Sequence, residues 1–164
     1  MNFCSRCGGR LPGAPPTTCR ACGYAVFVNA RPTGGVVVVE SDLFLSLRRA
    51  AEPKAGLWEL PGGFCDGWEH PADAAVREAR EEAGVEVELG EFLGMYLGEY
   101  EFQGETLPVL DCFWLARIVR GTVTIDPRES VEYAWFPLGS PPHLAFHSMV
   151  AAIAAASNWH RAQV

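Results

Sequence analysis

The chain has 164 residues, of which 49% are hydrophobic and 20% charged, and this balance excludes an intrinsically disordered protein. Its 20 acidic and 13 basic residues give a net charge of −7, which argues against a broad nucleic-acid-binding surface because such surfaces are basic. No run of about 18 apolar residues is present, so we expect no membrane span. The N-terminus has no apolar signal region, and we therefore expect a cytoplasmic protein.

The first residues contain two Cys-x-x-Cys pairs, Cys4/Cys7 and Cys19/Cys22. Two such turns can bring four thiolates together at the tetrahedral geometry that suits Zn²⁺. The segment between the pairs is rich in proline and glycine and has almost no core of its own, so a metal would hold it together. Two disulfides are the alternative, which a reducing compartment disfavours. The pattern resembles a zinc ribbon over residues 1–28, with a structural or dimer-forming role.

The amino-acid composition changes from about residue 24, where runs of β-forming residues begin. Residues 33–40 and 42–47 predict a hairpin, and residues 57–60 predict a short strand that stops at Pro61-Gly62-Gly63. Strands and helices mix without a strict βαβ repeat, so we expect a mixed sheet between helices. The remaining expected elements are strands over 85–89, 92–102, 106–120 and 132–137 and a closing helix over about 146–160.

A helix is predicted from Pro71, at its first position, to Ala83, with Gly84 ending it. Glu78, Glu81 and Glu82 fall at i, i+3 and i+4, so their carboxylates share one face. A solvated acidic face is the simplest interpretation. The alternative is a site for Mg²⁺ or Mn²⁺, because these cations prefer oxygen ligands and would turn the mutual repulsion into binding.

The glycines and charges around this helix follow a fixed spacing. Residues 63–85 read G-x5-E-x7-R-E-A-x-E-E-x-G-V, which resembles the Nudix box at every fixed position. Soft departures are Ala79, where the family has a bulkier aliphatic residue, and Trp68, where many members have glycine. Leu47-Arg48-Arg49 and the run from Gly56 to Gly63 are also typical of Nudix hydrolases. The N-terminal segment resembles the zinc-ribbon subgroup of that family, which includes NADH pyrophosphatases.

The resemblance implies an α/β fold, the Nudix α/β/α sandwich with a mixed sheet over residues 29–164, preceded by a small N-terminal zinc ribbon. It also implies metal-dependent hydrolysis of a nucleoside diphosphate linked to another group, X, in a small-molecule nucleotide. Two or more metal ions can clamp a diphosphate and activate water. The implied roles are metal ligation by Glu78, Glu81, Glu82, the Gly63 carbonyl and, through water, Glu69; Glu78 as candidate base; and Arg77 orienting the carboxylates.

Further candidates lie outside the box. In some family members another glutamate acts as base or ligand, and Glu129 and Glu132 stand where such a residue can fall; the alternative is a charged loop. Arg48 and Arg49 follow a strand and could reach a phosphate, or else solvent. Trp68, Tyr96 and Tyr100 could each stack on a base, but for Tyr96 and Tyr100 we expect packing in the core.

The substrate is constrained by what the chain lacks. NADH pyrophosphatases of this subgroup carry the motif S-Q-P-W-P-F-P-x-S after the box, and nothing here resembles it. We therefore expect ADP-ribose or a related nucleotide sugar or dinucleotide. The alternatives are a non-catalytic nucleotide sensor and an enzyme that removes RNA 5′ caps. Many family members are dimers, so the resemblance allows a homodimer.

Overall fold

The computed structural model describes residues 1–163 and divides into two compact units, Met1–Ala30 and a second unit that begins at Arg31. In the first unit, β1 (Thr17–Thr18) and β2 (Ala25–Val26) form a two-stranded antiparallel sheet. Only four residues make up its buried cluster, Cys4, Leu11, Cys19 and Val26. Two of those four are cysteines, so the apolar core of this unit is minimal.

The second unit is built on a seven-stranded sheet with the order β5-β4-β3-β8-β7, to which β6 adds on β3 and β9 on β4. The pairing of β3 with β8 is parallel and the other pairings are antiparallel, so the sheet is mixed, as predicted. The strands are β3 (Arg31–Glu40), β4 (Leu43–Arg49), β5 (Trp58–Glu59), β6 (Gly62–Phe64), β7 (Glu86–Phe102), β8 (Glu105–Arg120) and β9 (Ser130–Pro137).

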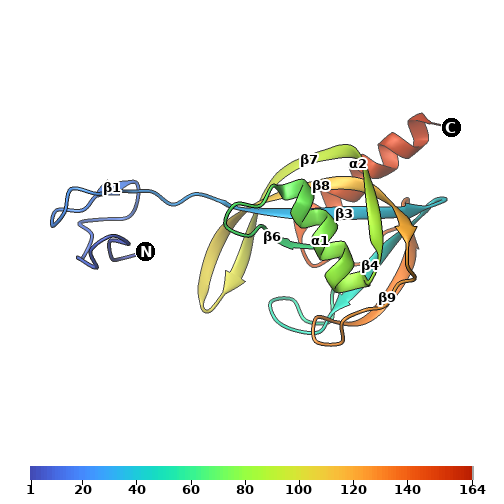
Figure 1. Ribbon diagram of the computed structural model, residues 1–164, viewed down its shortest axis with the longest axis horizontal. Coiled ribbons are helices and arrows are strands. Elements are labelled where there is room, and N and C mark those ends of the chain that lie inside the picture. The colour runs from blue at the N-terminus through green and yellow to red at the C-terminus, as the bar shows by residue number, and fades with distance from the viewer. Residues whose placement is uncertain (164) are drawn as a thin grey trace. The chain divides into compact units, whose positions relative to one another are not determined.

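Two helices cover opposite faces of this sheet, α1 (Pro71–Ala83) and α2 (His147–Ala162) (Figure 1). Successive side chains of a strand point to opposite faces. Val36 and Val38 of β3 pack in the cluster that contains α1, whereas Val37 packs in the cluster that contains α2. The arrangement is the predicted α/β/α sandwich. Among residues 1–163, no helix is long and apolar enough to cross a membrane.

Helix α1 lies unusually close to the sheet because small residues line its inner face. Ala75, Ala79 and Ala83 are fully buried at a spacing of four residues. Opposite them, a β-carbon at Gly34 of β3 would lie 2.0 Å from the Pro71 carbonyl oxygen, so helix and strand meet backbone to backbone. A bulkier residue than alanine at 79 would have to fit into this narrow space.

The termini of α1 agree with the sequence signals. The His70 Nδ1 atom accepts a hydrogen bond from the Ala72 N–H at 3.1 Å and caps the first turn. At the other end, Gly84 adopts a left-handed conformation with φ 67° and closes the helix. The helix therefore begins and ends where predicted.

Strand β7 differs from the prediction of two separate strands. It runs without a break from Glu86 to Phe102, with shifts of its register against β8 between Leu89 and Phe92 and between Phe92 and Gly94. The interruption of the apolar pattern at Gly90-Glu91 marks an irregularity within a continuous strand rather than a turn.

Candidate active site

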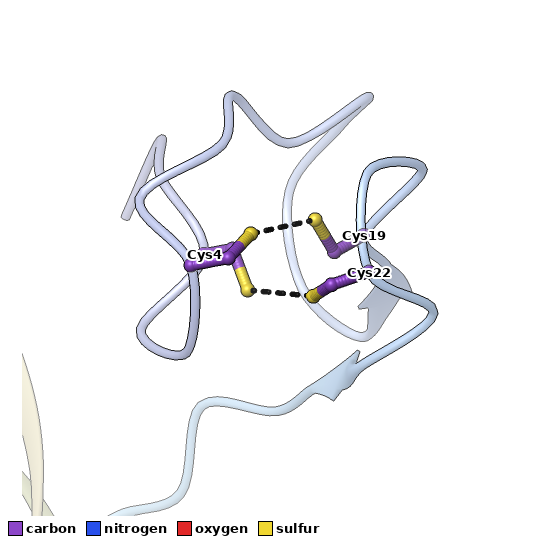
Figure 2. Close-up of side chains that lie close together, drawn as sticks. Cys4, Cys19 and Cys22 are labelled. Carbon is purple, nitrogen blue, oxygen red and sulfur yellow. Dashed lines mark hydrogen bonds between the residues drawn. The ribbon is translucent and has the colours of Figure 1, made fainter.

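The four cysteines of the N-terminal unit converge on one point (Figure 2). The Sγ atoms of Cys4 and Cys22 lie 3.8 Å apart, and those of Cys7 and Cys19 lie 3.7 Å apart. All four lie within 4.8 Å of one another, and all six cysteines of the chain are free. Four tetrahedral ligands at the usual Zn–S distance of about 2.3 Å would lie about 3.8 Å apart. The cluster therefore fits one zinc ion rather than two disulfides.

The second unit contains a cavity of about 340 Å³ between α1, β6 and the sheet. Gly63 of β6 and Glu78 and Glu82 of α1 line it, and these are three of the residues predicted to bind metal. Glu81 points elsewhere and is exposed. Other residues from six strands, the neighbouring loops and α2 complete the wall, among them Thr33, Arg49, Glu52, Glu59, Phe64, Glu99, Tyr100, Asp111, Arg128, Glu129, Phe146 and Met149.

Glu82 is the most enclosed of the predicted ligands. Its Oε2 atom accepts a hydrogen bond from the Gly62 N–H at 2.9 Å, which ties α1 to β6. Removal from water raises the pKa of the Glu82 carboxyl well above the usual value, and the neighbouring carboxylates of Glu59 and Glu78 raise it further. Burial likewise raises the pKa of Glu78. Several carboxylates therefore share one partly enclosed space with little compensating positive charge.

Gly63 lies directly against Glu78. A β-carbon at position 63 would be 2.4 Å from the Glu78 Oε1 atom, so only glycine fits there without moving the carboxylate. The backbone of β6 is brought to the carboxylates because Gly63 pairs with Gly34 of β3. Gly63 therefore allows β6 to lie directly against the acidic face of α1.

Arg77 holds the carboxylates around it in a network. Its Nε and Nη2 atoms donate to the two Glu69 carboxylate oxygens at 2.9 and 2.8 Å, and its Nη1 atom donates to Glu78 at 2.6 Å and Glu81 at 3.1 Å. Nη2 also donates to the Phe64 carbonyl at 3.0 Å. The hydrogen bonds from Arg77 lower the pKa of Glu69 to about 2. Arg77 thus orients three carboxylates and keeps Glu69 ionised.

A divalent cation fits this donor set. Its residues offer carboxylate and carbonyl oxygens, the ligands that Mg²⁺ and Mn²⁺ prefer. A cation would also compensate the negative charge of Glu82, whose pKa is raised first by burial and then by repulsion from neighbouring carboxylates. Within residues 1–163 the four cysteines are the only group of three or more ligating side chains whose atoms lie within 4.8 Å of one another. The carboxylates around Arg77 are thus spread more widely than the ligands of a closed metal site.

Arg49 and Glu59 form a buried ion pair on another wall of the cavity. The Arg49 guanidinium also lies over the Phe146 ring, 5.3 Å from its centroid. Burial raises the pKa of Glu59 to about 7 although Arg49 opposes the shift. Of the two arginines proposed to reach a phosphate, Arg49 faces the cavity.

Of the other candidates from outside the box, one lines the cavity and the rest do not. Glu129 lines the cavity. Glu132 instead pairs with Arg48 at 3.1 Å, and both side chains are about half exposed and do not line it. Trp68 is fully exposed and does not line it either. Their roles as base, ligand or substrate contact stay predictions.

Several cavity residues escaped the sequence reasoning. Tyr100 was expected in the core, yet its ring lines the cavity between Phe64 and Phe146, with centroids 5.3 and 5.8 Å away. Asp111 lies on the wall and accepts a hydrogen bond from the Thr33 hydroxyl at 2.7 Å. The burial of Glu59 could have been predicted from the sequence, because a charged residue within the apolar run 57–60 is expected to be buried with a partner. The position of Asp111 could not, since only strand pairing brings it to the cavity.

Comparison with known proteins gives one family and one fold. Residues 29–154 match the model of the NUDIX domain. The structure of a NUDIX hydrolase from Nitrosomonas europaea superposes with a TM-score of 0.76, covering 98% of this chain and 91% of that one at 24% sequence identity. At that identity the likeness shows the fold.

Curated relatives differ in their activities. The CTP pyrophosphohydrolase of Escherichia coli is 31% identical, covering 70% of this chain and 90% of the relative. The NAD-capped RNA hydrolase NudC of Pseudomonas aeruginosa is 28% identical over 91% of this chain, but the chain spans only about half (52%) of that relative's length. The ADP-ribose pyrophosphatase of Methanocaldococcus jannaschii is 24% identical, covering 75% of this chain and 71% of the relative.

Proposed function

The chain belongs to the Nudix hydrolase family, and from this premise we propose that it hydrolyses the pyrophosphate bond of a nucleoside diphosphate joined to another group, with Mg²⁺ or Mn²⁺ as cofactor. The observation that carries the proposal is the cavity in which Gly63, Glu78 and Glu82 meet. ADP-ribose or a related nucleotide sugar or dinucleotide is the proposed substrate. The ADP-ribose pyrophosphatase among the relatives supports this choice.

The roles proposed for the residues follow from their placement. Metal ions bound by Glu78, Glu82 and the Gly63 carbonyl would activate water and neutralise the diphosphate. Glu78 is half-buried and its pKa is raised, so it is suited to accept a proton from water. Arg77 fixes the Glu78 carboxylate in one orientation.

The Arg49 guanidinium is proposed to pair with a phosphate oxygen, and its contacts with Glu59 and Phe146 beside the same cavity support this role. Glu129 adds a further carboxylate to the cavity wall and is a second candidate base. Glu81 and Glu69 lie outside the cavity wall and are proposed to act at the metal through water or after a side-chain rotation.

Removal of an RNA 5′ cap is a second candidate function. The similarity to NudC covers 91% of this chain and must therefore include part of residues 1–30, the cysteine-containing unit. The acidic net charge opposes extended contact with a phosphate backbone. A short capped RNA would then be bound chiefly through its cap.

A substrate panel in Mg²⁺ or Mn²⁺, with products identified by mass spectrometry, tests the proposal. The panel contains ADP-ribose, NADH, diadenosine polyphosphates, nucleotide sugars, CTP and NAD-capped RNA. We expect AMP from ADP-ribose, and reaction in heavy-oxygen water identifies the phosphorus that water attacks. Preferred turnover of CTP or of capped RNA would contradict the substrate choice, and no turnover with the metal bound would favour the nucleotide sensor.

A further inference from the structure

A second space lies next to the active-site cavity and shares two lining residues with it. This groove of about 550 Å³ is lined by residues 52–54, in the loop that joins β4 to β5, and by residues 100–104, at the hairpin end of β7 and β8. Glu52 and Tyr100 line both the cavity and the groove, so the two spaces meet at these residues. A molecule whose diphosphate lies beside Glu78 and Glu82 therefore has room for its second half beyond Tyr100.

An aromatic surface leads from the cavity into the groove. Tyr100 and Phe102 are two residues apart on β7 and so point to the same face of the sheet. The Tyr100 ring is held between Phe64 and Phe146, whereas the Phe102 side chain is 47% exposed on the groove wall. An exposed ring beside an open groove can stack on a heteroaromatic base.

The opposite wall carries Lys54, the only lysine of the chain. Its φ of 68° is a conformation that a residue with a β-carbon rarely adopts. Hydrogen bonds hold the loop in this shape: the Lys54 N–H donates to Glu52 at 2.8 Å, and the Arg49 Nε atom donates to the Pro53 carbonyl at 2.7 Å. No carboxylate of residues 1–163 lies within 4.0 Å of the Lys54 ammonium group, so it is free to bind an anion.

We propose that this groove binds the second nucleoside of a dinucleotide, with its base stacked on Phe102 and its phosphate paired with Lys54. The inference rests on the proposed function and narrows the group X from any substituent to a nucleoside. Glu52 and Glu101 line the groove beside Lys54 and can accept hydrogen bonds from ribose hydroxyls. A nucleoside triphosphate has no second nucleoside and would leave this groove empty.

Diadenosine diphosphate and ADP-ribose differ only in the second adenine, so together they isolate the stacking contact. We expect Phe102→Leu to raise KM for diadenosine diphosphate about tenfold, which lies within the range that base–aromatic stacking contributes, and to change KM for ADP-ribose less than about twofold. The value of kcat should stay unchanged for both. Phe92→Leu is the matched control, since Phe92 is an exposed aromatic residue of the same strand outside both spaces.

Lys54 is tested on the same two compounds. Lys54→Met should raise KM for both, because both carry the second phosphate, and Lys54→Arg should restore it. An equal effect of Phe102→Leu on the two compounds, or no effect, would overturn the groove assignment. If the wild-type protein hydrolyses neither compound, the proposed function fails. Calorimetric binding of both compounds with Ca²⁺, which takes the same oxygen ligands, then decides the groove by the same Phe102→Leu comparison.

Discussion

At the scale of single residues, Gly63 and Gly67 form a natural comparison. Gly63 lies within β6 and Gly67 lies in the loop that follows it. A β-carbon at Gly63 would lie 2.4 Å from the Glu78 carboxylate, whereas one at Gly67 would meet nothing within 4 Å. A methyl group would therefore displace the Glu78 carboxylate at position 63 but would meet no neighbouring atom at position 67, although the sequence does not distinguish the two glycines.

Gly63→Ala should displace the Glu78 carboxylate and lower kcat by roughly a hundredfold, since misplacing a reacting group by about 1 Å can cost that much. The fold should persist, because the added methyl group would meet the end of a side chain, the Glu78 carboxylate. Steady-state kinetics on the best substrate of the panel measure the effect. Gly67→Ala is the control and should retain activity within about twofold; equal activity of the two variants would show that Glu78 is not needed where it lies.

Glu82→Gln should separate catalysis from stability. The amide oxygen can still accept the hydrogen bond from the Gly62 N–H, but the charge that lies among Glu59 and Glu78 is gone. We expect kcat to fall by roughly a hundredfold or more, because a metal ligand is lost. We also expect Tm of the metal-free protein to rise by about 2–4 °C, equivalent to about 1 kcal/mol.

The pH dependence of that rise follows from the sign of the pKa shift. The pKa of Glu82 in the folded protein lies above its usual value of 4.5, so its ionisation destabilises the fold. This penalty is absent below pH 4.5 and grows as the pH rises from there towards the folded-state pKa. Calorimetry in EDTA should therefore show a larger Tm difference between variant and wild type at pH 8 than at pH 5. A Tm below that of the wild type at pH 8 would contradict this account.

Whether a site residue could be predicted depends on whether a short stretch of sequence identifies it. Glu78 and Glu82 share a helix face and belong to one short pattern, so the sequence was enough to single them out. Tyr100 and Asp111 reach the cavity only because β7 and β8 pair along their length, and sequence spacing carries no information on that register. Trp68 lies beside the box in sequence, yet its side chain points entirely into solvent.

At the scale of elements, α1 was predictable to the residue because its start and end are chemical signals, Pro71 and Gly84. The strands were located well, but the two segments 85–89 and 92–102 were expected to be separate. A bulge and a turn both interrupt an apolar pattern, and only the hydrogen bonds to β8 distinguish them.

The N-terminal unit is the element that depends most on a metal. Its buried cluster consists of two cysteines and two aliphatic residues, Leu11 and Val26, which is too little to fold about 30 residues unaided. We expect about one zinc ion per chain by elemental analysis. A strong chelator should release it and unfold residues 1–30, which hydrogen exchange would report as lost protection there with unchanged protection in α1. Protection that survives zinc removal would contradict a metal-dependent fold.

At the scale of the whole molecule, the two units have separate cores. The cluster of Cys4, Leu11, Cys19 and Val26 shares no residue with the two clusters on either side of the large sheet. The match to the NUDIX domain also begins at residue 29, close to where the second compact unit begins at Arg31. Each unit therefore has a buried cluster of its own.

Deletion of residues 1–30 should leave the large sheet and both helices folded. We expect the midpoint of urea unfolding, followed by tryptophan fluorescence, to change little, because all five tryptophans lie in the second unit. Cys7→Ser in the full chain serves as a comparison that disrupts only the cysteine cluster. Loss of cooperative unfolding in the shortened chain would show that the first unit supports the second.

Gly34 and Gly35, within β3, also limit the substitutions that this chain can accept. A β-carbon at Gly34 would meet the Pro71 carbonyl at 2.0 Å, and one at Gly35 would meet the Phe113 ring at 2.6 Å. The next residues, Val36–Val38, are buried but can exchange with other aliphatic residues of similar size at a cost of about 1 kcal/mol. Tolerance to mutation should therefore change abruptly within one strand: a saturation library would lose every variant at position 34 while retaining several at 36 to 38.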